Sequence, residues 1–290
     1  MKYAYLILIT FLGCSSQKDN SDLFSSGHSQ GTVDKELEEA SGLVASIANP
    51  SNYWTLNDSG NDAQIFLIND KAETVLTCTL AGINNRDWED IAISKEIAEE
   101  KNYVYVGEIG DNNARYPYKI IYRFAEPKVN PDFIGIDNLV ITQFDTLVFK
   151  LSDGIRDTEA LMIDPISNEF YIVSKREDAV HLYQLSNHFN SGDTLVAEFK
   201  TELPYSYIVA ADISSDGKEV LMKDYDHIYY WKKIGQESIP ELLKKAPFTL
   251  TYEREPQGES IAWQRDGSGF YTLSETLKDF RGKLIYYKRK

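Results

Sequence analysis

A short phrase that recurs five times constrains this chain more than any other feature. It consists of two small or acidic residues followed by an aliphatic one, and successive copies begin 48, 70, 52 and 48 residues apart. Each copy precedes an aromatic or aliphatic segment that ends in charged residues, such as YWTLND, FYIVSKR and FYTLSE. The five copies are Ser41-Gly42-Leu43, Glu89-Asp90-Ile91, Glu159-Ala160-Leu161, Ala211-Asp212-Ile213 and Glu259-Ser260-Ile261.

This period predicts a repeat architecture, because self-similar units of about 50 residues accommodate the four strands of a propeller blade. We therefore predict an all-β fold, a β-propeller of five four-stranded blades, with six blades as the alternative. The last unit stops at Lys290 without an outer strand. Residues 31–37 can supply that strand and close the ring, which removes an open sheet edge.

The N-terminus has the features of an export signal. Met1 and Lys2 precede an apolar run at 3–12, which is shorter than the roughly 20 residues that span a bilayer. The sequence Leu12-Gly13-Cys14 resembles a bacterial lipobox, which implies a signal peptide over residues 1–14 and lipid attachment at Cys14. Ordinary secretion with cleavage elsewhere is the alternative. Residues 15–30 are polar and predict a flexible tether, which leaves 31–290 as the propeller domain.

These features predict a lipid-anchored protein of the bacterial cell envelope, held in the outer membrane with its domain either in the periplasm or on the cell surface. We expect it to contact the membrane through the anchor only and to be a monomer. The formal net charge of -15 argues against nucleic acid as a partner, because phosphates require lysine and arginine on the binding face. Cys78 is the only cysteine after residue 14, so we predict that it packs in a strand and forms no disulfide.

Blade geometry predicts where the functional residues gather. In an antiparallel blade the start of the innermost strand and the end of the second strand lie at the same end. The residues that open four of the phrases should therefore surround one mouth of the central tunnel that the blades enclose, and they are Ser41, Glu89, Glu159 and Glu259. Converging carboxylates repel one another unless a cation lies among them. Oxygen ligands without cysteine or histidine suit Ca²⁺. Alternatively, these side chains bond backbone amides and lock neighbouring blades together.

Two known groups share short motifs with this chain. The segments SGLV and WTLNDSG resemble the calcium-activated nucleotidase (apyrase) family, whose five-bladed propeller holds one calcium ion among a serine or glutamate from each blade. That resemblance implies the same four metal ligands, while Ala211 departs from the pattern and would need water, its own carbonyl or Asp212 as a substitute. The segments DWEDIA and VGEIGDN look closer to the SdiA-regulated (YjiK-like) and phytase-like esterase propellers.

These resemblances imply a calcium-dependent hydrolase of a nucleotide, phytate or a similar anionic ester. Asp58 or Glu108 would position the attacking water, and the side chains that offset charge on substrate phosphates would be Lys175, Arg176 and Lys223. Asp58 and Asp111 can equally be turn residues that accept from their own backbone. A non-catalytic surface protein that binds a ligand beside a structural calcium ion is the second predicted function.

Overall fold

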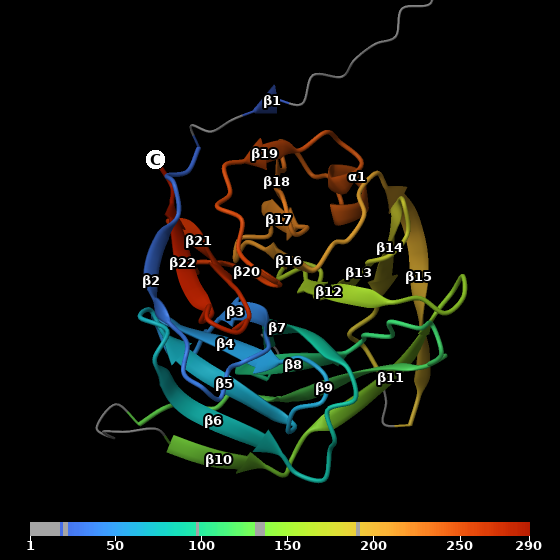
Figure 1. Ribbon diagram of the computed structural model, residues 1–290. Helices are drawn as coiled ribbons and strands as arrows, with labels where there is room; N and C mark the ends of the chain where they lie inside the picture. The colour runs from blue at the N-terminus through green and yellow to red at the C-terminus, as the bar shows by residue number, and fades with distance from the viewer. Residues whose placement is uncertain (1–17, 20–22, 97–98, 131–136, 190–191) are drawn as a thin grey trace, which may run out of the picture.

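The computed structural model describes residues 18–19, 23–96, 99–130, 137–189 and 192–290 (Figure 1). The predicted signal peptide, Cys14 and residues 15–17 and 20–22 of the predicted tether lie outside these residues. The described part of the chain consists of strands β1–β22 and a single short helix, α1 (Ile239–Leu243). None of its helices is long and apolar enough to cross a bilayer. The predicted all-β class is confirmed.

Five inner strands form a closed ring at the centre of the molecule (Figure 1). Each of them contacts the next one along the chain, and the last contacts the first. A ring of five inner strands means five blades within the described residues, so the alternative of six is not realised. The inner strands are β3 (Ala40–Ala45), β7 (Trp88–Glu96), β12 (Thr158–Ile163), β16 (Ala210–Ile213) and β20 (Ser260–Trp263).

Each inner strand begins a blade of four antiparallel strands. Blade 1 continues with β4 (Asn52–Asn57), β5 (Gln64–Asn69) and β6 (Thr74–Leu80). Blade 2 continues with β8 (Lys101–Glu108), β9 (Lys119–Ala125) and β11 (Asp145–Leu151). Blade 3 continues with β13 (Phe170–Ser174), β14 (Val180–Leu185) and β15 (Thr194–Leu203). Blade 4 continues with β17 (Glu219–Lys223), β18 (Ile228–Lys232) and β19 (Phe248–Leu250), and blade 5 with β21 (Gly269–Leu273), β22 (Lys283–Lys288) and β2 (His28–Thr32).

The ring is closed by an N-terminal strand, as the sequence predicts, although that strand lies earlier in the chain. Strand β2 pairs antiparallel with β22 as the outer strand of blade 5. Phe24 is buried between blades 4 and 5, where its ring meets Tyr230 and Phe270. The packed domain therefore begins near residue 23, before the predicted boundary at residue 31.

The outer strands pair in ways that the repeat does not indicate. Strand β10 (Asp137–Ile141) lies parallel to β6 as a fifth strand of blade 1, and β1 (Lys18–Asp19) lies parallel to β19 in blade 4. Strands β11 and β15 also pair in parallel, which joins blades 2 and 3 into one eight-stranded sheet. These pairings cover backbone groups that an outer strand would otherwise expose.

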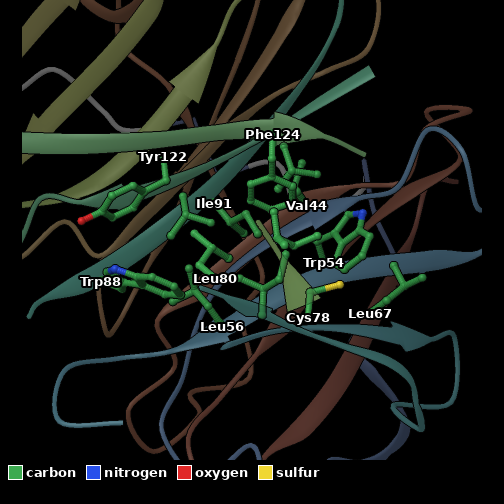
Figure 2. Packing of buried hydrophobic residues seen from close by; sticks show 14 of the residues in the cluster. Val44, Trp54, Leu56, Leu67, Cys78, Leu80, Trp88, Ile91, Tyr122 and Phe124 are labelled. Atoms are coloured by element: carbon green, nitrogen blue, oxygen red, sulfur yellow. The ribbon is translucent and has the colours of Figure 1, made fainter. Parts of the chain in front are cut away.

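Neighbouring blades pack through large apolar side chains. Between blades 1 and 2, Trp54 and Trp88 are fully buried with Tyr122 and Phe124, and Cys78 lies in the same cluster (Figure 2). The prediction that Cys78 packs in a strand is confirmed. Burial of this apolar surface between successive blades, and of the final surface between blades 5 and 1, is the main driving force for closing the ring.

Two aspartates tie neighbouring inner strands together. The Oδ2 atom of Asp90 accepts from the backbone N–H of Leu161 in blade 3 at 2.8 Å, and its Oδ1 atom accepts from the N–H of Ile91. Asp212 does the same between blades 4 and 5, where its Oδ2 accepts from the N–H of Trp263 at 2.8 Å. In the two copies of the phrase whose central residue is acidic, that residue therefore links neighbouring blades.

Replacing Asp90 should weaken the ring. Asp90→Ala leaves the buried N–H groups of Ile91 and Leu161 without this acceptor, so we expect the free energy of unfolding to fall by about 2 kcal/mol. Urea denaturation measures the change. The matched control is Asp62→Ala at an exposed position, which should stay within about 0.5 kcal/mol of the unmodified protein. Equal stability of the two variants would contradict the linking role.

Candidate functional site

The four predicted metal ligands meet at one end of the ring of inner strands, which we call the mouth. Ser41 pairs with Glu259 across the seam between blades 1 and 5, and its hydroxyl donates to the carbonyl oxygen of Glu89 at 2.6 Å. The carboxylates of Glu159 and Glu259 are joined through Lys175. The structure thus brings these residues together as predicted. The hydroxyl of Ser41 bonds the backbone of the next blade, which is the arrangement that the alternative prediction describes.

More carboxylates converge here than the sequence indicated. Within the described residues, three groups of three acidic residues each place one oxygen atom per residue within 4.8 Å of the others. The groups share Asp58 and Glu89 and so comprise seven residues. They are Asp58, Asp87 and Glu89; Asp58, Glu259 and Glu275; and Glu89, Asp157 and Glu159.

Asp87 and Asp157 were not predicted to lie here. Glu275 was expected beside the mouth from its place at the end of a second strand, but it was given no role. Asp87 and Asp157 each stand two residues before the glutamate of the recurring phrase, so an Asp-x-Glu pattern in two units was the available signal. Glu275 follows β21 at the end of a second strand, where the blade geometry gathers charged residues. All three side chains are buried, and they double the number of carboxylates that the phrase alone supplies to the mouth.

Burial and mutual repulsion change the acidity of this group. Burial raises the pKa of Asp58 to about 6, and Glu259 and Asp87 add to the increase. Burial and the neighbouring Glu259 raise the pKa of Glu275 to about 9. Burial and the nearby Glu159 hold the pKa of Glu89 well above its ordinary value. In the absence of a bound cation, carboxyl groups of the mouth therefore retain protons at pH values at which exposed carboxylates are already ionised.

The donor set fits a hard divalent cation. Each of the three groups consists only of carboxylates, and oxygen donors with negative charge are the ligands that Ca²⁺ prefers. Blade 4 contributes no such oxygen from Ala211. Its neighbour Asp212 cannot substitute as predicted, because its carboxylate bonds Trp263 and lines a pocket with Ser94 and Ser215 at the other end of the inner strands. Tyr225 occupies the side of blade 4 instead and donates to Oε1 of Glu259.

The three cations predicted to contact substrate lie in different environments. Arg176 is partly exposed, and its Nε atom donates to Oδ2 of Asp157 at 2.6 Å. Lys175 is buried in the mouth. Lys223 is fully buried and donates to the carbonyl oxygen of Gly258, and burial lowers its pKa. The predicted contact of Lys223 with a phosphate stays a prediction, and it requires the ammonium to leave Gly258.

The two predicted catalytic carboxylates also differ. Asp58 belongs to two of the carboxylate groups and accepts from the backbone N–H of Ser59. Glu108 lies apart from these groups, where it accepts from the hydroxyl of Tyr122 at 3.2 Å and forms an ion pair with Arg86 at 3.4 Å. Of the two, Asp58 is the one that the structure places in the mouth.

Asp111 has the turn role that the sequence suggested for it. Its Oδ1 and Oδ2 atoms accept from the backbone N–H groups of Arg115 and Tyr116. Its own N–H donates to Oδ1 of Asp157 at 2.7 Å. The loop that follows β8 is thereby held against the carboxylates of the mouth.

Comparison with known proteins assigns this chain to no family. The site and topology define the chain as a five-bladed β-propeller with an acidic tunnel mouth. No family model matches it, and no curated protein does. It is similar to the PQQ-bound aldose sugar dehydrogenase of Streptomyces coelicolor at 10% identity and a TM-score of 0.48, over 91% of this chain and 98% of that one. So distant a likeness carries no argument about activity. The resemblance to nucleotidases and esterases rests on the short motifs alone.

A glycine makes the close packing of the mouth possible, and replacing it should be costly. A Cβ atom on Gly110 would lie 2.6 Å from Cγ of Asp87 and would also strike the carboxylate of Glu89. We expect Gly110→Ala to lower the free energy of unfolding by about 1–3 kcal/mol, as overpacking does. Gly235→Ala is the matched control, since its Cβ meets only a side-chain oxygen at 3.7 Å. Equal melting temperatures for both variants would contradict this packing.

The raised pKa values predict an unusual pH dependence in the absence of calcium. Because folded Asp58 and Glu275 hold protons that the unfolded chain releases, the free energy of unfolding in EDTA should increase as pH falls from 7.5 to 5.5. Glu275→Gln should make this slope shallower, whereas Glu36→Gln at an exposed position should not. Chemical denaturation across this pH range measures the slope, and a protein that loses stability on acidification would contradict the prediction.

Proposed function

We propose that this propeller binds Ca²⁺ at its acidic mouth and hydrolyses a phosphate ester or another anionic ester outside the cytoplasm. The single observation that carries the proposal is the overlap of three carboxylate groups at one end of the tunnel. So many buried carboxylates repel one another, and a divalent cation is the ligand that best relieves this repulsion. Attachment through a lipidated Cys14 would hold the domain at the outer membrane.

The residues of the mouth suit the separate tasks of ester hydrolysis. A bound calcium ion would supply positive charge for an anionic ester. Asp58, with its pKa near 6, is ionised at neutral pH yet basic enough to orient a water molecule and accept its proton. Arg176 carries the partly exposed guanidinium at this end, and it can donate to an ester oxygen while bonded to Asp157.

A second function, ligand binding without catalysis, is favoured by a different observation. Lys175 and Lys223 are both buried, and each is already engaged, with carboxylates and with a backbone carbonyl respectively. Phosphoryl transfer benefits from cations that are aimed at the transferring group. If these two stay where they are, the mouth offers little charge for catalysis, and calcium would support the blades instead.

Phosphate release distinguishes the two functions. We expect release from nucleoside di- and triphosphates or phytate in calcium, and none in EDTA. Glu159→Gln replaces a negatively charged calcium ligand with a neutral one, so we expect kcat/KM to fall by about 100-fold or more. Asp62→Ala on the surface should leave kcat/KM unchanged. Release that persists in EDTA would contradict metal dependence. No release in either condition, with calcium still raising the melting temperature, would favour the non-catalytic protein.

A further inference from the structure

The ammonium group of Lys175 lies within the carboxylates of the mouth. Its Nζ atom is 2.9 Å from Oε2 of Glu159 in blade 3 and 3.7 Å from Oε1 of Glu259 in blade 5. The residue is only 7% exposed. One positive charge from the chain itself therefore bridges two of the residues predicted to bind calcium.

The backbone fixes the position of this side chain. The N–H of Lys175 donates to the carbonyl oxygen of Asp157 at 3.1 Å, and its own carbonyl accepts from the N–H of Tyr207 at 2.7 Å. Lys175 follows β13 directly, so its main chain belongs to the rigid part of blade 3. The side chain of Lys175 therefore extends toward the centre of the ring from a backbone that hydrogen bonds hold in place.

An aromatic ring supports the same arrangement. The Nζ atom of Lys175 lies 5.5 Å from the ring centroid of Tyr225, whose hydroxyl donates to Glu259. Cations over tyrosine rings are attracted by the negative face of the ring. The carboxylates of Glu159 and Glu259 thus face a lysine ammonium, whose ordinary state at neutral pH is positively charged.

We propose that Lys175 is a tethered cation that competes with a divalent ion for Glu159 and Glu259. The inference builds on the proposed calcium site and assigns Lys175 a positioning and tuning role in place of a direct contact with substrate. Like charges at this separation repel, so a divalent ion at these two carboxylates must displace the ammonium or bind beside it at a cost. Lys175 thus weakens calcium binding and stabilises the calcium-free mouth.

Calcium titration of a variant that lacks the charge of Lys175 tests this role. Lys175→Met keeps the apolar stem and most of the length of the side chain but removes its charge. In isothermal titration calorimetry we expect its Kd for calcium to fall at least tenfold. Its melting temperature in EDTA should drop, and calcium should restore it. Lys175→Arg retains the charge and should bind calcium with a Kd within a few fold of that of the unmodified protein. The same should hold for Lys150→Met, at an exposed position of the outer strand of blade 2.

The outcomes separate this inference from the proposed function. Lys175→Met with unchanged Kd and unchanged stability in EDTA would overturn the inference, whatever the unmodified protein hydrolyses. Calcium binding by Lys175→Met but not by the unmodified protein would support the inference and reject the calcium-dependent hydrolase.

A double-mutant comparison covers the case in which Lys175→Met does not fold. Lys175→Met/Glu159→Gln removes one charge of each sign and should fold in EDTA. It should bind calcium more tightly than Glu159→Gln alone, because Glu259 is freed from the ammonium. Equal affinity of these two variants would overturn the competition.

Discussion

Closure of the five inner strands into a ring is the constraint on which the rest of this structure depends. Each inner strand begins at the same end of the tunnel, so the residue that opens each phrase is carried to the axis. The ring is held by apolar packing between blades and by the bonds of Asp90 and Asp212 to the backbone of the next blade. Residues from separate blades therefore meet at fixed positions.

Closure of the ring also brings negative charges close together at the mouth, where they repel one another. Seven carboxylates lie close together, and repulsion between them opposes the compact state. The ammonium of Lys175 offsets part of this repulsion, and the raised pKa values of groups such as Glu275 favour protonated carboxyl groups, which reduces it further. A divalent cation would be a third contribution. The fold alone does not indicate a reaction, because propellers support many functions. Function therefore has to be argued from the charged residues of the mouth.

Much of the architecture could be predicted because it repeats. The phrase and the strands that follow it located all five blades, and the geometry of antiparallel strands placed Ser41, Glu89, Glu159 and Glu259 at one mouth. Strand β10 and the pairing of β11 with β15 were missed because outer strands carry no phrase and their partners are far away in the chain. Asp212 was suggested as one substitute for the ligand that Ala211 lacks, and this was wrong. Neighbouring residues of a strand point to opposite sides, and the carboxylate of Asp212 accepts from the N–H of Trp263 instead.

The sequence by itself determined the repeat, the strand pattern and the kinds of side chain that open each blade, because these depend on local periodicity. Only the tertiary structure decided which charges meet. Lys175 lies 16 residues from Glu159 and 84 residues from Glu259 in the chain, yet its ammonium bridges both. Burial of Lys223 and the recruitment of Asp87, Asp157 and Glu275 likewise depend on how blades pack. Contacts across a closed ring depend on the positions of all five blades together, and no single segment of the sequence determines those positions.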